Sequence, residues 1–592
     1  MSSRYPFLTL SYYRERDALK RQGEAEPHPF FKSRDCLCQI NKMAQSRAKP
    51  KSHSNFITQL PDKDLPDLTL CLVTYNSAEW LEGWTKAIEN LNYPRQKLKI
   101  SWVDNNSSDN TLEILNSTLE AAGLSSHLES MLKQDNRGFG AGQNLAVAQA
   151  KTDYILIINP DAELEPESLR FAVNYALADE TDVSCWEFSQ APFEHPKYYD
   201  PVNLETSWNS HACVLMKRSA FLKVGGYDTT LFLYGEDVEL SYKLRAHGYK
   251  LRYLPKARIY HDTSPDPKRR EDQMTRSIAA NLLLRRRYGR YWDRAVGIVL
   301  ITKSAFTSNI DQRKSVAKAN EIYTELKPSF KPSRRHKTYF PFNGLEYDRR
   351  RLGRLTPIKA YKTPQTNQRG HTSPLVSIIT RVHKTTDILY DAIACVENQT
   401  YSNIEHVIVF DGCDPINDDR IKAVYSNQTG RSEAANKGAK AASGDYLLFL
   451  DYDDLIFSDH IEGLVDRLNN KKEAVCAYSY CWEAMTKSRE TGTVSYLALQ
   501  NKMETQFSSQ GLAENNFFAI QSVLIKSDAF RHVGGFDTRL EYCEDWDLWQ
   551  RLLKLGEFTP YKKLTSIYFT PASLKDRILR SWDMARQVQS KK

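Results

Sequence analysis

The sequence predicts an α/β protein with two similar modules, each built on a mostly parallel sheet with helices on both faces. Short apolar runs rich in β-branched residues alternate with amphipathic helical patterns, which is typical of a parallel sheet. The alternation occurs twice in the 592 residues, and the second copy repeats the first in order. With 41% hydrophobic residues, the chain is long enough to fill two or more cores.

The repeat divides the chain into four segments. We predict a basic N-terminal extension over 1–65, a first module over 66–265, a basic helical connector over 266–373 and a second module over 374–592. Each module opens with a predicted strand, a helical pattern and a second strand, and these strands are 68–74, 98–103, 376–380 and 406–410. Ligands of such sheets bind beyond the carboxyl ends of the strands. Polar clusters follow these ends, beginning at Asp104 and Asp411.

The same acidic pattern follows a later strand in both modules. The first copy reads Asn159-Pro160-Asp161 and the second reads Asp451-Tyr452-Asp453-Asp454. Farther along, each module has a Gly-Gly-aromatic-Asp turn and then a Glu-Asp pair that opens a helix, Glu236-Asp237 and Glu544-Asp545. A carboxylate at the end of a strand and another at the start of a helix suit a metal–diphosphate site with a nearby base.

Positive charge is concentrated between the modules. The whole chain has a formal net charge of +8, whereas residues 266–369 contain 25 Lys and Arg against 9 Asp and Glu. A predicted helix over 269–291 places Arg285-Arg286-Arg287 beside Leu282-Leu283-Leu284. This helix could lie against an anionic membrane surface or a polyphosphate lipid head, or its arginines could simply be solvated. No nucleic-acid-binding motif accompanies the charge, so we expect no nucleic acid partner.

The sequence predicts a cytoplasmic protein, with the inner membrane surface as a peripheral partner. The longest apolar stretches fall far short of the roughly 20 residues of a spanning helix, and Met1 to Arg16 contains no apolar signal block. Ten cysteines lack metal-ligand spacing, which favours reduced core thiols. The oligomeric state is left open.

The first module contains an ordered set of motifs: Val73-Thr74-Tyr75-Asn76, Val103-Asp104-Asn105-Asn106-Ser107, Asn136-Arg137-Gly138-Phe139-Gly140, Asn159-Pro160-Asp161 and Tyr234-Gly235-Glu236-Asp237. This set resembles the glycosyltransferase family 2 proteins, especially the branch that contains bacterial rhamnosyltransferases. The second module resembles the same family through Asn398-Gln399-Thr400-Tyr401, Phe410-Asp411-Gly412, Ala435-Asn436-Lys437-Gly438, Leu450-Asp451-Tyr452-Asp453-Asp454 and Cys543-Glu544-Asp545-Trp546. The resemblance implies two domains of the GT-A fold, the Rossmann-like fold of nucleotide-diphosphosugar transferases.

The resemblance also implies roles for the donor-binding residues. Thr74 and Tyr75 would frame the base pocket of the first module, and Asp104 or Asn105 would recognise the base and ribose there. Asp411 would do so in the second module, although Asp-Asn-Asn and Asp-Gly are also ordinary turn formers. The second module has Arg381-Val382 where a Pro-Thr-Tyr string is more common in the family, which leaves its base contacts open.

The resemblance also implies that the acidic turns bind a metal ion. A divalent cation, Mn²⁺ or Mg²⁺, would offset the charge that develops on the leaving diphosphate. In the second module we expect Asp453 to bind the metal and Asp451, on the same face of an extended segment, to bind the diphosphate or ribose. In the first module Asp161 takes the metal role, and Asn159 stands where the second module has its first acid.

One histidine distinguishes the two copies. His261 lies 24 residues after Asp237, and Phe569 lies 24 residues after Asp545, within the matching strings Ile259-Tyr260-His261 and Ile567-Tyr568-Phe569. In several members of the fold a histidine near this place completes the metal shell, so His261 is a candidate third contributor to the first site. A hydrogen-bonded structural histidine is the alternative interpretation.

The function implied is that of a bifunctional, inverting glycosyltransferase of bacterial surface polysaccharide (O-antigen or capsule) biosynthesis. It would transfer sugars from nucleotide-diphosphate sugars to a glycan or lipid-linked glycan acceptor. Asp237 and Asp545 would act as the bases that deprotonate the acceptor hydroxyl, although acids also cap helix starts. Two alternatives remain open: one catalytic module with a degenerate scaffold module, or a glycan-binding assembly protein without turnover.

Overall fold

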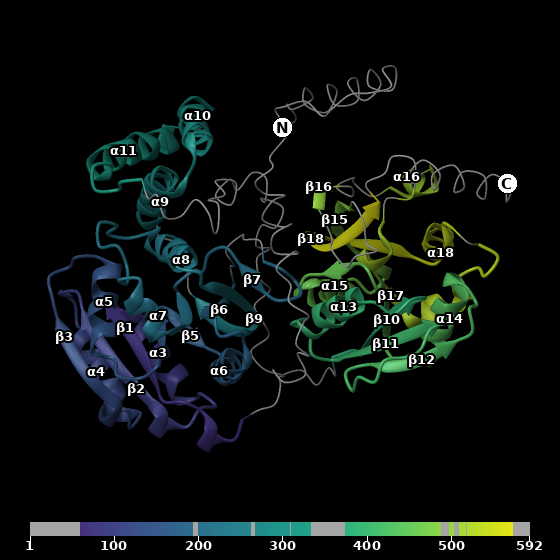
Figure 1. Cartoon of the computed structure of the whole chain (residues 1–592), viewed down its shortest axis with the longest axis horizontal. Coiled ribbons are helices and arrows are strands. Elements are labelled where there is room, and N and C mark those ends of the chain that lie inside the picture. The colour runs from purple at the N-terminus through teal and green to yellow at the C-terminus, as the bar shows by residue number, and fades with distance from the viewer. Residues whose placement is uncertain are drawn as a thin grey trace.

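The computed structural model describes residues 60–192, 194, 199–261, 267–307, 310–332, 373–486, 496–501, 508–514, 516, 518–540 and 542–571. Two sheets with helices on their faces lie side by side in this part of the chain (Figure 1). The strands of the first sheet fall between residues 68 and 261, and those of the second between 376 and 571. The predicted α/β class with two modules is therefore confirmed.

The two sheets have the same strand order. The first sheet contains β1 (Leu68–Thr74), β2 (Leu98–Asp104), β3 (Leu128–Lys133), β4 (Tyr154–Ile158), β5 (Ala162–Leu164), β6 (Val183–Ala191), β7 (Glu205–Thr206), β8 (Cys213–Lys217) and β9 (Lys250–His261). Its order is β3-β2-β1-β4-β8-β6-β9-β5, with β7 paired to β9. β1, β2, β3 and β4 are parallel, and β8 joins β4 antiparallel.

The second sheet repeats this order in eight of its strands, and only its ninth strand pairs with a different neighbour. It contains β10 (Val376–Val382), β11 (Ile404–Asp411), β12 (Lys422–Ser426), β13 (Tyr446–Asp451), β14 (Leu455–Ile456), β15 (Ala474–Thr486), β16 (Tyr496–Asn501), β17 (Val523–Lys526) and β18 (Glu557–Pro571). Its order is β12-β11-β10-β13-β17-β15-β18-β14, and β16 pairs with β15. The repeat seen in the sequence is therefore a repeat of topology.

Helices cover both faces of each sheet. The first module has α3 (Leu81–Glu89), α4 (Thr111–Ala121), α5 (Phe139–Gln149), α6 (Ser168–Ala178), α7 (Arg218–Lys223) and α8 (Glu236–Ala246). The second has α13 (Asp387–Glu397), α14 (Arg431–Ala441), α15 (His460–Asn470), α16 (Ser509–Glu514), α17 (Ser527–His532) and α18 (Glu544–Leu553). Between the modules lie α9 (Pro267–Tyr288), α10 (Tyr291–Thr307) and α11 (Ile310–Leu326).

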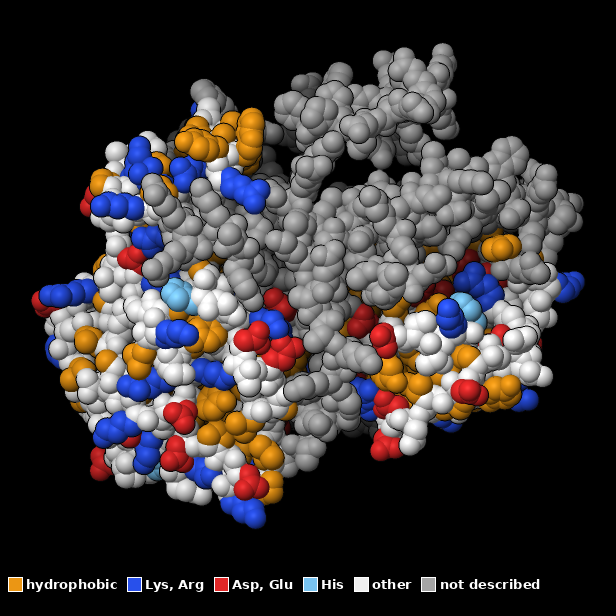
Figure 2. Space-filling model, viewed as in Figure 1, with side chains coloured by type: hydrophobic (Ala, Val, Ile, Leu, Met, Phe, Trp, Pro, Cys, Tyr) orange, Lys and Arg blue, Asp and Glu red, His pale blue; other side chains and the backbone are white. Residues whose placement is uncertain are grey.

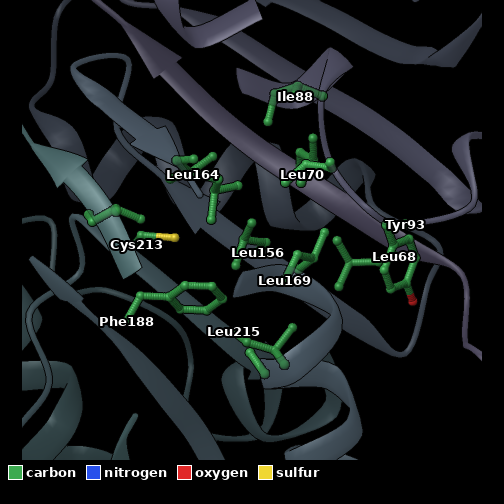
Figure 3. Packing of buried hydrophobic residues seen from close by; sticks show 14 of the residues in the cluster. Leu68, Leu70, Ile88, Tyr93, Leu156, Leu164, Leu169, Phe188, Cys213 and Leu215 are labelled. Atoms are coloured by element: carbon green, nitrogen blue, oxygen red, sulfur yellow. The ribbon is translucent and has the colours of Figure 1, made fainter. Parts of the chain in front are cut away.

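Alternation along the central strand β1 explains the two layers of core. Leu68, Leu70 and Leu72 face one cluster, which includes residues of α3, α4 and α6, while Cys71 and Val73 face another with residues of α5, α7 and α8. Figure 3 shows part of the first cluster, in which Leu68 and Leu70 lie near residues of β4 and α6. Because both faces are covered, every residue of β1 is buried.

Two arginines of α9 are hydrogen-bonded within the protein, and one of them, Arg287, joins this helix to the first module. Arg285 is buried and donates to Asn281 Oδ1 and to the carbonyl of Asp293. Arg287 donates to Asp228 Oδ2 at 2.6 Å and to Glu239 Oε1 at 2.8 Å. The helix predicted over 269–291 is present as α9 but ends at Tyr288. The idea that its arginine run forms a solvated or lipid-facing surface is wrong for these two side chains. Both side chains are instead hydrogen-bonded within the protein.

The two modules contact each other directly. Arg258 of β9 forms an ion pair with Glu462 of α15 at 2.7 Å, and Asn398 donates to the carbonyls of Pro201 and Val202. The ring of Tyr199 packs edge-on against Phe457. Val202 also joins a core cluster of the second module. None of the described helices is long and apolar enough to cross a bilayer.

Candidate active sites

The acidic turn of the first module lies where β4 ends. The backbone turns at Asn159, whose carbonyl accepts from Ala162 N, and the chain enters the short strand β5. β5 pairs antiparallel with β9, with Ala162 opposite His261. This register brings His261 Nε2 to 3.3 Å from Asp161 Oδ1. The two residues predicted to share a metal are thus neighbours, although they are 100 positions apart in the sequence.

The surroundings of His261 suit a ligand. Its Nδ1 lies 2.9 Å from Gln190 Oε1, and the tautomer that donates from Nδ1 to this oxygen has its Nε2 lone pair on the side of Asp161. Asp161 is buried, and the buried Oδ1 of Asn159 has no hydrogen-bond partner among the described residues. Gln190 was not predicted from the sequence, because nothing in the local pattern marks it.

These donors fit a divalent cation with two protein side-chain ligands. No group of three or more His, Cys, Asp and Glu that could hold a metal occurs in the part of the chain that the structure describes. A carboxylate and an imidazole leave several positions of an octahedral cation for diphosphate oxygens and water, which is how Mg²⁺ and Mn²⁺ commonly bind nucleotides. The first site therefore fits a metal held jointly with the donor.

The predicted donor-binding residues of the first module lie together at the ends of β1 and β2. Thr74 pairs with Asp104 across the strands, and its hydroxyl donates to Asp104 Oδ1 at 2.9 Å. Ser107 donates to Asp104 through its backbone N–H and its hydroxyl. Asn105 donates to the carbonyl of Gly138 and accepts from Gln134. Asp104, the last residue of β2, is thus hydrogen-bonded within the module and fully buried, while Tyr75 is 51% exposed.

The predicted base of the first module lies at the start of α8. Gly235 has a φ of 95°, which lets the chain turn into the helix with Glu236 and Asp237 in its first turn. Asp237 Oδ1 accepts from the backbone N–H of Val238. Glu236 Oε2 is buried without a hydrogen-bond partner among the described residues. Burial, with a smaller effect of Asp237, raises the pKa of Glu236 to about 8.

The second module places an arginine among its acids. Arg381 of β10 is buried and donates through Nε to Asp451 Oδ1 at 3.0 Å and through Nη1 to Glu544 Oε1 at 3.2 Å. Arg431 Nε lies 3.4 Å from the same Glu544 oxygen. The acidic turn and the start of α18 thus meet in one site, 93 positions apart in sequence. Sequence reasoning treated Arg381 only as a departure from the family pattern.

The side chains in the acidic turn of the second module differ in burial. Asp453, the predicted metal ligand, is partly buried, and Asp451 is held by Arg381. Asp454 is fully buried and its Oδ1 accepts from Phe569 N at 2.9 Å. Its Oδ2 has no hydrogen-bond partner among the described residues. Burial and the nearby Asp451 raise the pKa of Asp454 well above its usual value.

The strand pairing gives His261 a different counterpart in the second module from the one that the sequence strings suggested. In the first module Leu164 pairs with Ile259, and in the second Ile456, at the matching place after the acidic turn, pairs with Ser566. Counting along both strands puts Tyr568 at the position of His261, one residue before Phe569. The matching strings suggested Phe569, but its side chain is buried in the core of the module.

The predicted base and donor-binding residue of the second module are both hydrogen-bonded. Asp545 accepts from Asn516 Nδ2 at 3.0 Å and from Trp546 N, and burial together with Glu544 raises its pKa to about 6. Asp411 accepts from the backbone N–H groups of Thr429 and Gly430. Partial burial acts to raise the pKa of Asp411, but these hydrogen bonds outweigh it and lower the pKa.

Comparison with known families identifies both modules. Residues 69–239 match the family described as Glycosyl transferase family 2, and 376–568 and 203–280 match families described as Glycosyltransferase like family 2. The chain therefore belongs to glycosyltransferase family 2, with two domains of that family in tandem. The suspected family and the two-domain arrangement are confirmed.

Curated relatives match about a third of the chain. An uncharacterized glycosyltransferase of Rickettsia typhi is 30% identical over 200 residues, which are 31% of this chain and 60% of the relative. A Rickettsia prowazekii protein, also an uncharacterized glycosyltransferase, is 30% identical over 213 residues, 33% of this chain and 61% of the relative. Glycosyltransferase GlyG of Streptococcus pneumoniae is 27% identical over 179 residues, 27% of this chain and 60% of that protein. The chain thus spans about 60% of the length of these relatives.

Solved structures match about half of the chain. A mannosyltransferase from Pyrobaculum calidifontis, in complex with GDP-Man and Mn²⁺, shares 18% identity with a TM-score of 0.34, covering 49% of this chain and 81% of its own. TarS 1–349 of S. aureus shares 15% identity with a TM-score of 0.32, covering 44% and 81%.

Proposed function

We propose that the chain is a bifunctional glycosyltransferase whose two modules each transfer a sugar from a nucleotide-diphosphate sugar. One observation carries the proposal most directly. In the second module Arg381 contacts both Asp451 of the acidic turn and Glu544 beside Asp545. The residues that we propose for binding the leaving diphosphate and for acting as the base thus lie at one end of the sheet, where ligands of parallel sheets bind.

The chemistry of transfer assigns each group a task. The acceptor hydroxyl gives its proton to Asp237 or Asp545 as its oxygen attacks the anomeric carbon, and the bond to the diphosphate breaks on the opposite face, which inverts that centre. With a pKa near 6, Asp545 is mostly ionised at pH 7 and able to accept this proton. In the first module Asp161 and His261 would hold the cation with the donor, and the bound cation stabilises the negative charge on the departing diphosphate.

The proposed donors and acceptor rest on the resemblance of both modules to glycosyltransferase family 2. We propose a dTDP-rhamnose-like donor for the first module and a UDP-hexose or UDP-N-acetylhexosamine donor for the second. The acceptor is a lipid-linked or growing glycan of a bacterial surface polysaccharide, such as O-antigen or capsule. Such an acceptor places the protein at the cytoplasmic face of the inner membrane.

A second candidate function has one active module and one scaffold. Glu236 Oε2, which has no hydrogen-bond partner among the described residues, and Asn159, which stands where the second module has an acid, favour the first module as the scaffold under this alternative. A glycan-binding protein without turnover is the alternative from another class. Hydrolysis of a nucleotide sugar by the purified chain in the presence of Mn²⁺ would exclude it.

Radiolabelled nucleotide sugars would test the proposal. We expect Asp161→Ala and Asp545→Ala to abolish two different transfers, each leaving the other intact, because each substitution removes a carboxylate from one site. Glu129→Ala and Glu473→Ala, which change exposed acids of the same two modules, serve as matched controls. Loss of a single transfer by Asp545→Ala, with no effect of Asp161→Ala, would support the scaffold alternative instead.

A further inference from the structure

The outward face of α10 is apolar. Five large apolar side chains of this helix are exposed: Tyr291 by 87%, Trp292 by 81%, Val296 by 40%, Ile298 by 63% and Val299 by 64%. At about 100° per residue these positions lie on one side of the helix. Figure 2 shows hydrophobic side chains gathered over α10, with Lys and Arg side chains beside them. Soluble proteins rarely leave such a cluster uncovered without a function.

The orientation of α10 is fixed by its inner face. A Cβ at Gly297 would lie 2.7 Å from Arg285 Cδ, so the two helices approach closely because Gly297 has no side chain. The Arg285 guanidinium also donates to the carbonyl of Asp293 at 3.1 Å. The side of α10 that carries Gly297 is therefore held against α9. The large apolar residues of α10 lie on the opposite side and point away from the protein.

Charge on the three-helix unit α9–α11 and the residues that follow it indicates what could cover this face. The exposed basic side chains of this unit outnumber the exposed acids: they are Arg290, Arg313, Lys314, Lys318, Lys327 and Lys331, against Glu271, Glu321 and Glu325. Tryptophan and tyrosine favour the boundary between lipid headgroups and acyl chains, and basic residues add attraction to anionic lipids. Two copies of the same positive surface would repel each other, which disfavours self-association.

We propose that the outward face of α10 binds an anionic lipid surface, with the helix lying in the plane of the interface. The apolar side chains would enter the headgroup boundary while the basic side chains of the unit remain in water near the lipid phosphates. Binding of this kind needs no spanning segment, in keeping with the lack of one among the described helices.

The position of α9 connects this surface to the first active site. Ala280 of α9 packs against Gly235, the residue before Glu236. α10 begins at Tyr291, 11 residues after Ala280, and 11 residues span about 16 Å along a helix. A lipid surface at α10 would thus hold the first site close to a lipid-linked acceptor. This consequence rests on the proposed function, whereas the lipid contact itself does not.

Vesicle flotation with the full chain would test the contact without donor or acceptor, so its outcome is separate from that of the transferase proposal. We expect the protein to float with phosphatidylglycerol-containing vesicles, to float much less with pure phosphatidylcholine, and to be released by high salt. The variant Trp292→Glu/Ile298→Glu should lose flotation by roughly tenfold or more. Tyr425→Glu, at an exposed aromatic of the edge strand β12, is the matched control and should float normally.

Equal flotation of the wild type and Trp292→Glu/Ile298→Glu would overturn the proposal, as would no flotation of the wild type. Light scattering of the same samples identifies a rival occupant. A wild-type dimer that the double substitution disperses, without lipid binding, would assign the face to self-association and refute the lipid contact. Because both residues are exposed, we expect unchanged thermal unfolding of the variant.

Discussion

The two modules have the same sheet but place different charges at the same point of it. Arg381 pairs with Asp451 across β10 and β13, and the corresponding residues of β1 and of the turn after β4 are Val73 and Asn159. The second module therefore has a cation and an anion where the first module has two uncharged side chains. The difference teaches that a carboxylate in such a site is accompanied by a matching guanidinium, because an unpaired buried charge is costly.

The glutamates beside the two predicted bases, Glu236 and Glu544, also differ in their surroundings. Glu544 lies within hydrogen-bond distance of Arg381, whereas Glu236 of the first module has a buried oxygen without a hydrogen-bond partner among the described residues and a pKa of about 8. At neutral pH the first site thus holds a protonated glutamic acid, where the second has a glutamate in an ion pair with Arg381. The same residue type has opposite electrostatic roles in the two copies.

The largest expected effect separates the two bases. Asp545→Asn should lower the transfer by the second module about 10²–10⁴-fold and leave the other transfer unchanged, because only the proton acceptor is lost. Asp237→Asn should do the reverse. Rates with saturating labelled donors measure both. If either substitution slowed both transfers equally, the two sites would not be independent.

Arg381→Val should destabilise the second module by about 3–5 kcal/mol, since Asp451 and Glu544 lose their buried partner. The double variant Arg381→Val/Asp451→Asn reproduces the pair found in the first module and should recover much of that loss. Denaturant unfolding of the single and double variants gives the coupling energy. Additive effects would show that Arg381 and Asp451 are not one unit.

Glutamine substitutions should have opposite signs in the two modules. The folded-state pKa of Glu236 exceeds the ordinary value of 4.5, so its cost is absent below that pH and grows as pH rises toward 8. Glu236→Gln should therefore stabilise the first module by about 1–3 kcal/mol at pH 8 and not at pH 4. Glu544→Gln should destabilise the second module near neutrality. Thermal unfolding at both pH values would reveal the signs, and equal shifts would contradict the comparison.

The metal shell gives a smaller contrast. Gln190→Ala should weaken Mn²⁺ binding to the first site in the presence of nucleotide diphosphate about 10–100-fold, since Gln190 orients the imidazole. His261→Tyr, which introduces the residue type found at the matching position of β18, should weaken it more, because it removes a ligand. Isothermal titration would measure both, with Tyr568→Phe as the control. Unchanged binding in His261→Tyr would make this histidine structural.

The smallest effect concerns the pH profile of the second module. Activity should fall as pH drops through about 6, because Asp545 must be ionised to accept a proton. The hydrogen bond from Asn516 lowers this pKa, so Asn516→Leu should move the acidic limb to higher pH by a fraction of a unit. A limb that stays in place would remove Asn516 from the site.

Much of the site could be predicted because its motifs repeat in order. The sequence placed Asp161 and His261 in one metal shell, and the pairing of β5 with β9 brings them together. It did not reveal Gln190, which lies on another strand and is marked by no local pattern. It also aligned Phe569 with His261, because identical neighbours in a string outweighed a one-residue difference in strand pairing that the string cannot show.

The sequence by itself determined the two α/β modules and the acidic turns, because these follow from apolar periodicity and local turn chemistry. Only the tertiary structure decided which charges meet. Arg381 reaches Asp451 and Glu544 across strands and a helix start, and Arg285 and Arg287 turn inward rather than toward solvent. Electrostatic pairing depends on distances and burial, and these exist only after the chain has folded.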